Sequence, residues 1–383
     1  MSLWDQLVGQ ETAIAAVRAA AQPGSQAMTH AWMVVGPAGS GRSTLAHAFA
    51  ATLVSNGNDD EALAHVMAGT HPDVTLVATD RVTISIDEVR ELVTQSYYSP
   101  SQSKWRVIVM EDADRMTERT SNVLLKALEE PPPHTVWILC APSVQDVLPT
   151  IYSRVRTITL RTPTVEQVAT LIHQRHGVEL DVATMAAREA QSHIGMATRL
   201  ATDAEARARR DETVKAVLSL NSVSGAVNQA AHLIALAGAD QKALLEKLDQ
   251  QEREDTLRSL GVAPGGSVPA AIRGSVKALE DNQKRRATRS LRDGVDRIAT
   301  DITSVLRDVL MLQVGSGEPL VNERHRPALE ERAGATTAHH TLAAMEHVQI
   351  ARDRIAGNTP PQLALEAMLI AVSARVPLSE AVV

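Results

Sequence analysis

The sequence predicts an α/β domain built on a parallel sheet with helices on both faces, then a small helical domain, then an all-helical region. Three observations predict this order. Short apolar runs alternate with helical patterns over residues 1–162, which is typical of a covered parallel sheet. Thr162-Pro163 indicates a hinge into a helical segment at 163–209, and residues 210–383 show helical patterns throughout. A chain of 383 residues is long enough for two or three such domains.

The first domain is predicted strand by strand from its buried apolar runs. We expect strands at 32–35, 74–77, 106–110, 136–141 and 156–160, and helices at 10–20, 43–54, 58–68, 86–95, 117–130 and 143–150. The helix at 117–130 is the best marked, because Thr117 suits its start and Pro131-Pro132-Pro133 stop it. Glu129 and Glu130 oppose the helix dipole at its end, so something other than local stability is expected to keep these carboxylates.

The remaining chain is predicted to be helical. We expect helices at 164–176, 179–191 and 195–209 in the small domain, then at 211–220, 223–237, 239–260, 268–281, 284–314, 336–356 and 360–375. Loops rich in glycine and proline are expected at 261–269 and 315–319. The last helix carries an apolar stripe that fits either an intramolecular core or a contact with another subunit: Leu363, Ala364, Ala367, Met368, Ile370 and Ala371.

A glycine-rich loop follows the first predicted strand and leads into a helix. Strand, glycine loop and helix in that order are the context of a phosphate-binding loop, since backbone N–H groups and the helix N-terminus can then converge on an anion. An ordinary glycine-rich turn is the weaker alternative, because both flanking elements are recognisable. The candidate nucleotide-binding residues in this loop are Gly36, Gly39, Gly41, Arg42, Ser43 and Thr44.

Two positions depart from a working hydrolytic site. Arg42 stands where the standard loop has lysine, and its larger planar head places the catalytic geometry in doubt. Glu111 and Asp112 follow the strand at 106–110, where acidic residues normally hold Mg²⁺ and polarise the attacking water, but usually in the order Asp then Glu. Asp112 is one methylene shorter than the usual base, and such a displacement can cost on the order of 10² in rate.

Ser153-Arg154 closes the segment that follows the buried strand at 136–141. An arginine there is able to reach a phosphate held by a neighbouring subunit, because a guanidinium is always charged and grips phosphate oxygens with two donors. Such a finger supplied in trans raises turnover by roughly 10³–10⁵. A plain surface arginine at a strand edge is the alternative, and only the upstream motifs favour the finger.

These motifs together resemble the AAA+ clamp-loader ATPases. The resemblance is dense over residues 1–160 and thin between about 200 and 350. It rests on Leu7-Val8-Gly9-Gln10, His30-Ala31, Ala68-Gly69-Thr70-His71-Pro72-Asp73, Glu111 to Met116, Asn122 to Pro132, Ser153-Arg154 and Pro361 to Met368. Two further polar positions of the family look lost, because Ala141 ends the fourth strand and Arg199 is one place off the usual spacing in Gly195 to Arg199.

The resemblance implies a nucleotide-binding domain of AAA+ type at 1–162, a helical lid at 163–209 and an oligomerisation collar at 210–383. It implies a clamp-loader subunit of a replicative polymerase holoenzyme, which is a component of that enzyme and not the polymerase itself. Motor and other loader subunits in a five-membered ring, the sliding clamp and primed DNA would be its partners. Its own ATPase is expected to be weak or absent, and the residues leave open whether ATP and Mg²⁺ bind.

Two alternatives from other classes remain. One is an active ATPase motor of the same loader, against which Arg42, the order Glu111-Asp112 and Ala141 count together. The other is a Holliday-junction or related AAA+ remodeller. We would expect such a protein to carry intact nucleotide-site motifs and a DNA-binding module after the lid, and the sequence indicates neither.

Composition bounds the remaining possibilities. The formal net charge of −7 argues against an autonomous DNA-binding protein. Cys140 is the single cysteine and lies in an apolar strand, so it predicts a core residue. The stretch from Ser55 to Glu61, where clamp-loader relatives often hold zinc, has no cysteine, so no metal is expected there. No apolar run approaches about 20 residues and the N-terminus shows no signal-peptide pattern, which predicts a cytoplasmic protein.

Overall fold

The computed structural model describes residues 4, 7–55, 57, 59–79, 83–238, 249, 273–357 and 359–373. Contacts divide the chain into two units, Met1–Thr202 and Asp203–Val383, each described here by itself. The centre of the first unit is a five-stranded sheet made of β1 (Ala31–Val35), β2 (Val74–Val77), β3 (Arg106–Met110), β4 (Thr135–Ala141) and β5 (Arg156–Thr159). All five predicted strands are therefore confirmed, each to within one residue at either end.

All neighbouring strands pair in parallel, in the order β2-β3-β4-β1-β5. Strands β1 and β4 are buried along their whole length, as expected for central strands covered on both faces. The chain leaves β1 for the far edge of the sheet before it returns to β4. Ligands bind at such a switch in strand order, outside the carboxyl ends of the strands.

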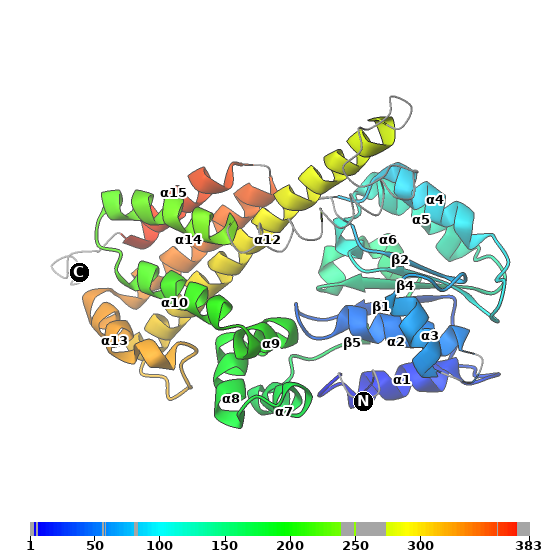
Figure 1. Ribbon diagram of the computed structural model, residues 1–383, viewed down its shortest axis with the longest axis horizontal. Helices are drawn as coiled ribbons and strands as arrows, with labels where there is room; N and C mark the ends of the chain where they lie inside the picture. Colours follow the sequence, from blue (N-terminus) through cyan, green and yellow to red (C-terminus); the bar gives the residue numbers. More distant parts are fainter. Residues whose placement is uncertain are drawn as a thin grey trace. The chain divides into compact units, whose positions relative to one another are not determined.

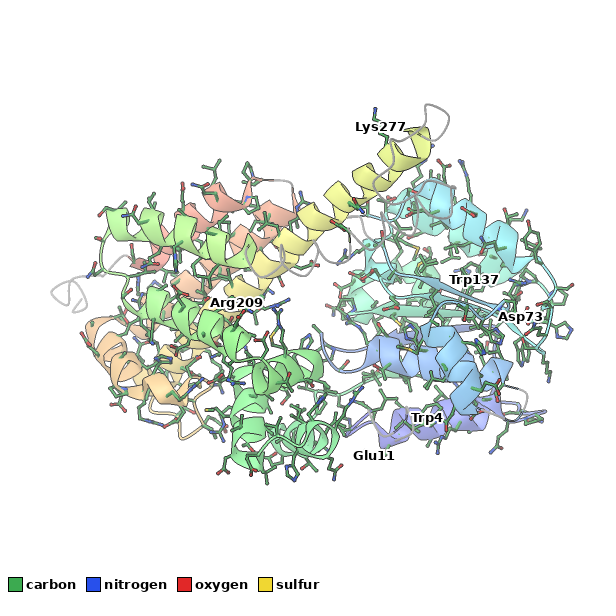
Figure 2. All side chains as sticks on the ribbon, viewed as in Figure 1. Trp4, Glu11, Asp73, Trp137, Arg209 and Lys277 are labelled. Atoms are coloured by element: carbon green, nitrogen blue, oxygen red, sulfur yellow. The ribbon has the colours of Figure 1, made fainter. Side chains whose placement is uncertain are left out.

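Helices cover both faces of the sheet, which confirms the predicted fold class (Figure 1). One face packs against α1 (Glu11–Ala21), α2 (Arg42–Val54) and α3 (Asp59–Met67). The other packs against α4 (Ile86–Ser96), α5 (Glu118–Glu129) and the short α6 (Pro149–Tyr152). The largest side chains at the centre are fully buried, among them Trp32 and Trp137, and Figure 2 shows Trp137 within the sheet. Cys140 is buried in β4, as predicted.

The predicted helix at 143–150 is wrong. The segment forms a 3-10 turn, η3 (Val144–Asp146), then two extended residues, and only then α6. The reason is Pro149, which disfavours helical geometry at Leu148 but is tolerated in the first turn of the next helix. As a result Ser153 and Arg154 follow a single short helical turn.

The first unit ends with three helices, α7 (Val165–His176), α8 (Leu180–Glu189) and α9 (Ile194–Thr202). The predicted helix 195–209 is wrong in its second half. The side chain of Asp203 accepts hydrogen bonds from the N–H groups of Glu205 and Ala206, and so begins a new helix, α10 (Ala204–Leu218), which continues through residues 209 and 210.

The second unit is all-helical among its described residues. It contains α10, a helical stretch at 223–238, α12 (Arg273–Gln313), η5 (Glu323–His325), α13 (Arg326–Ala335), α14 (Ala338–Ala356) and α15 (Pro361–Ser373). Helix α12 is continuous where two helices with a break at 282–283 were predicted, and α13 was not predicted. The predicted helix 239–260 lies, except for residue 249, outside the described residues, as do the loop 261–269 and the start of the helix 268–281.

The apolar stripe of α15 is divided between two environments. Ala364 and Met368 are buried in the core of the second unit, which confirms the intramolecular core as the environment of these two side chains. Leu363 is 58% exposed and Ala367 is also exposed. Among the described residues, no helix combines the length and the apolar character needed to cross a membrane.

Candidate functional site

The predicted phosphate loop lies at the carboxyl end of β1, next to β4. The N–H of Gly36 donates to the carbonyl of Ala141, 3.3 Å away, which joins the start of the loop to the end of β4. Gly39 and Gly41 have φ of +76° and +95°, in the left-handed region that favours glycine. Helix α2 begins at Arg42, so Ser43 and Thr44 stand in its first turn. The backbone therefore has the form of an anion cradle at a helix N-terminus.

Two side chains of this chain lie against the loop. Arg42 Nη1 donates a hydrogen bond back to the carbonyl of Gly36. His193, from the connection between α8 and α9, packs against Gly39, because a Cβ on that glycine would clash with the imidazole ring. The N–H of Ile194 also donates to the Gly39 carbonyl at 3.4 Å. The position that normally supplies a point charge to the β and γ phosphates is thus turned toward the loop backbone.

Glu111 forms a cluster with two side chains of α2. Its Oε1 lies 2.9 Å from Nε2 of His47, and the Ser43 hydroxyl is near enough to help lower its pKa. Burial raises the pKa of Glu111, but the hydrogen bonds from His47 and Ser43 outweigh it and hold the pKa below its usual value. Glu111 is therefore charged at neutral pH, and His47 of α2 lies within hydrogen-bond distance of it.

Asp112 points elsewhere. Its Oδ2 accepts from the N–H of Thr79 at 3.1 Å, and its Oδ1 pairs with Arg115 at 3.6 Å. Ala141 is fully buried and offers no polar side chain beside the loop, while Ser143 uses its hydroxyl to cap η3. The two carboxylates that follow β3 are therefore held by separate sets of partners.

The loop fits a phosphate better than it fits a hydrolytic reaction. Its glycines and helix N-terminus suit an anion, and Ser43 and Glu111 are the residue types that hold Mg²⁺ beside a nucleotide. The residues expected to contact the γ phosphate and the attacking water, Arg42 and Asp112, are engaged with Gly36, Thr79 and Arg115. Within the described part of the chain, no group of three or more His, Cys, Asp or Glu side chains is arranged to hold a metal ion.

Arg154 contacts a different set of residues. It follows α6, its side chain is 36% exposed, and its Nη2 lies 2.6 Å from Oε1 of Glu129 at the end of α5. Its Nη1 donates to the carbonyl of Thr150 at 2.7 Å and to Oγ of Ser153 at 3.0 Å. Ser153 is thus placed to orient the guanidinium, and both predicted residues stand at the surface of the first unit.

Other motif residues hold this domain together. Gln10 donates to the carbonyl of Arg161 at 2.7 Å and accepts from its N–H at 3.1 Å, which ties the N-terminal motif to the chain just before α7. His30 Nε2 lies 2.8 Å from the carbonyl of Leu128 and so anchors the end of α5. Asp73, marked in Figure 2, is fully buried and accepts hydrogen bonds from three consecutive residues, Ser101 to Ser103. These motif residues therefore have structural roles.

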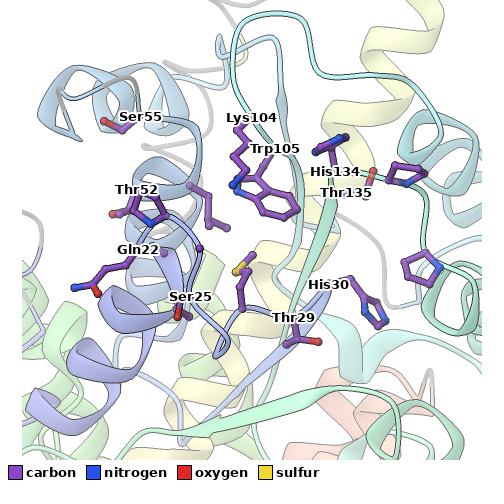
Figure 3. Close-up of a pocket in the computed structure, with 18 of the residues that line it drawn as sticks. Gln22, Ser25, Thr29, His30, Thr52, Ser55, Lys104, Trp105, His134 and Thr135 are labelled. Carbon is purple, nitrogen blue, oxygen red and sulfur yellow. The ribbon is translucent and has the colours of Figure 1, made fainter.

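A cavity of about 850 Å³ opens at the amino-terminal ends of β1, β3 and β4, opposite the end that carries the phosphate loop (Figure 3). Trp105 and His134 pack there with ring centres 6.0 Å apart, and Nζ of Lys104 lies 5.2 Å from the centre of the Trp105 ring. The phosphate-loop residues do not line it. The cavity and the phosphate loop are therefore separate places on this domain.

Sequence reasoning did not assign three residues to the site, although it had singled out one of them, Glu129, for its place at a helix end. His47 stands one helical turn after Ser43 and shares its face of α2, so its spacing carried a signal. Glu129 was signalled by its unfavourable place at a helix C-terminus. His193 comes from another part of the fold, and it stands two residues before the segment Gly195 to Arg199, which the resemblance had singled out.

Comparison with known proteins gives one family match. The model of the family described as DNA polymerase III, delta subunit, matches residues 9–164. A gamma/tau subunit of DNA polymerase III from Mycobacterium tuberculosis is 30% identical over 189 residues, which are 46% of this chain and 32% of that protein. A delta' subunit from Pseudomonas aeruginosa is 34% identical over 134 residues, 33% of this chain and 41% of that protein.

A delta' subunit from Haemophilus influenzae is 31% identical over 157 residues, 39% of this chain and 48% of that protein. The chain thus spans between about a third and a half of the length of these relatives. The shared region contains the phosphate loop, the Glu111-Asp112 pair and Ser153-Arg154. On this match and these relatives, residues 9–164 of the chain are similar to delta, delta' and gamma/tau subunits of DNA polymerase III.

Proposed function

We propose that this chain is the delta-prime-type subunit of a clamp loader, silent in hydrolysis, which donates Arg154 to the ATP site of a neighbouring motor subunit. The observation that carries the proposal is the arrangement after β3. Glu111 lies 2.9 Å from His47, and Asp112 is bound by Thr79 and Arg115, so the carboxylate expected to act as the base is not directed to an attacking water. Arg42 supports the same conclusion.

In this proposal the chain works within a five-membered ring that contains gamma/tau-type motors and a delta subunit, and it helps to load the sliding clamp onto primed DNA. Clamp opening requires that the ring prefer one state with ATP and another after hydrolysis. An arginine supplied in trans provides such a difference, because it gains its strongest contact only when a phosphate is present across the interface.

A second function, the motor of the same loader, is favoured by one structural observation and one comparison. The backbone of residues 36–44 keeps the form of an anion cradle, and a gamma/tau subunit is among the relatives. The two functions differ in what the purified chain does alone. A finger-donating subunit hydrolyses no ATP by itself, whereas a motor shows steady turnover that Asp112→Asn abolishes.

The finger is tested with Arg154→Ala in the assembled complex. We expect hydrolysis at the site that Arg154 completes to fall by about 10³-fold or more, which lowers the total DNA-dependent rate by that site's share. Arg154→Lys keeps the charge but loses the two-donor grip, so we expect it to restore little of the rate. The measurement is phosphate release with primed DNA and clamp present.

The matched control is Arg119→Ala, which removes an exposed arginine from the surface of α5. It should leave the rate of the complex unchanged, and circular dichroism should give all three variants the melting temperature of the wild type within a few degrees. Full activity of the Arg154→Ala complex would refute the finger.

A further inference from the structure

The contacts of Arg154 divide its guanidinium into a fixed part and a replaceable part. Nη1 is held by groups one and four residues away in its own turn, the Ser153 hydroxyl and the Thr150 carbonyl. Nη2 is held by the carboxylate of Glu129, 2.6 Å away and 25 residues distant in the sequence. Only the second partner is an anion, and an anion of another kind is able to take its place.

The place of Glu129 is not explained by the stability of its own helix. It is the last residue of α5, where the partial negative charge of the helix end disfavours a carboxylate. Its side chain is 48% exposed, so water would solvate it if Arg154 were elsewhere. The neighbouring Glu130 is the C-cap residue of the same helix and is also exposed. The two residues thus share one environment, but the ion pair with Arg154 is made by Glu129.

We propose that Glu129 is a positioning residue for the finger: its carboxylate is the resting partner of Arg154 Nη2 and competes with the phosphate that the finger serves. This inference rests on the proposed function of Arg154. In the resting subunit the guanidinium is held in one place by three contacts. When a neighbouring site presents a phosphate, one anion replaces another at Nη2, while Thr150 and Ser153 continue to hold Nη1.

The competition has a defined physical cost. A carboxylate and a phosphate carry the same sign of charge, so a Glu129 that stays beside an engaged Arg154 repels the phosphate, and a Glu129 that leaves loses its partner. Both cases favour the resting state. Removing the charge of Glu129 while keeping its size therefore shifts the finger toward engagement.

The variant Glu129→Gln removes that charge with little change in shape. We expect the assembled complex to need roughly two- to fivefold less ATP for half-maximal rate, the effect expected for a single partly exposed ion pair. We expect kcat to stay unchanged, because the resting contact is lost equally from the ground state and the transition state of the engaged complex. The difference from wild type should shrink at high salt, since exposed charges are screened.

Glu130→Gln is the control, because it removes an exposed carboxylate from the adjacent position, and we expect it to match the wild type. A second readout needs no partner subunit. In the isolated full chain, the side-chain NMR signals of Arg154 should shift and sharpen in Glu129→Gln and stay unchanged in Glu130→Gln, because only the former frees Nη2. Melting temperatures of both variants should stay near that of the wild type.

The double variant Arg154→Ala with Glu129→Gln separates this inference from the function on which it rests. If Glu129 acts through Arg154, the double variant behaves as Arg154→Ala alone. Should Arg154→Ala reduce activity while Glu129→Gln matches wild type or needs more ATP, Glu129 is no competitor and the finger stands. Full activity of the Arg154→Ala complex would overturn the finger, and the competition with it.

Discussion

Asp73 is a charged residue that is completely shielded from solvent. It is fully buried beneath the loop at 101–103, where its carboxylate accepts five hydrogen bonds. Burial raises its pKa, but the hydrogen bonds from Ser101, Gln102 and Ser103 outweigh it and hold the pKa well below its usual range. The charge is thus part of the folded state, although no opposite charge lies nearer than Arg106, whose Nη2 is 3.7 Å away.

We expect Asp73→Asn to destabilise the first unit by about 2–4 kcal/mol, because an amide places donors against donors in a buried site. A carboxyl whose folded pKa is lowered contributes stability that is present above its unfolded pKa of about 3.9, and that is lost as pH falls toward the folded value. The wild type should therefore lose stability below about pH 4, and Asp73→Asn should lose less. Urea unfolding at several pH values measures both.

Asp87→Asn is the comparison, since Asp87 is 86% exposed and pairs with Arg90 within one helical turn. It should change the free energy of unfolding by less than about 0.5 kcal/mol. Equal effects of the two substitutions would show that the hydrogen bonds of Asp73 contribute little to stability.

Among the elements, helix α15 has apolar side chains in the core and on the surface. Met368 faces the core of the second unit, whereas Leu363 stands 58% exposed on another face. We expect Met368→Ala to lower the free energy of unfolding by about 2–5 kcal/mol, because it leaves a cavity. Leu363→Asp should change stability little but weaken assembly with other subunits. Thermal unfolding and size-exclusion chromatography of the reconstituted complex distinguish the two.

A strong loss of stability in Leu363→Asp would mean that this face belongs to the core. Unchanged assembly would mean that no subunit packs there. Ser316→Asp, on the loop after α12, introduces the same charge at another surface position and should affect neither measurement.

Elements also show how much of the fold the sequence can predict. Strands β1, β3 and β4 were predicted closely because central parallel strands are apolar on both faces, so their sequence alone marks them. The break between α9 and α10 at Asp203 was missed, although an aspartate before a helical run is a capping signal. Helix α13 was missed because its hydrophobic pattern is short. Arg332 of this helix is buried and donates hydrogen bonds to the carbonyls of Val217, Leu220 and Val372. The local sequence does not predict these contacts, because their partners lie far away in the chain.

The candidate site also contains residues that the sequence predicts and residues that it does not. The loop at 36–44 and the carboxylates after β3 were predicted because each is a motif of consecutive residues. Their partners were not, because His47, His193 and Glu129 reach their positions only when helices from separate parts of the sequence are packed. Sequence patterns therefore predict which residues carry the chemistry better than they predict what holds those residues in place.

At the scale of the whole molecule, the two units have separate hydrophobic cores. Two clusters of buried side chains, one on each face of the sheet, form the core of the first unit, and a third fills the helical unit from Asp203 onward. We expect calorimetry of the full chain to show two unfolding transitions, since units with their own cores unfold without a shared all-or-none step. Asp73→Asn should lower only one of them, and Met368→Ala only the other. A single transition lowered by both substitutions would contradict this expectation.

Cys140 gives the molecule a practical property. It is fully enclosed in the central strand β4, and burial raises the pKa of its thiol, so little of the reactive thiolate forms while the sheet is intact. A cysteine introduced at an exposed site beside Arg154 would then be the one thiol that a fluorescent maleimide reaches in the native protein. Cys140 would react only after β4 separates from its neighbouring strands. The introduced cysteine therefore carries the dye, and the lack of reaction at Cys140 indicates that the sheet is intact.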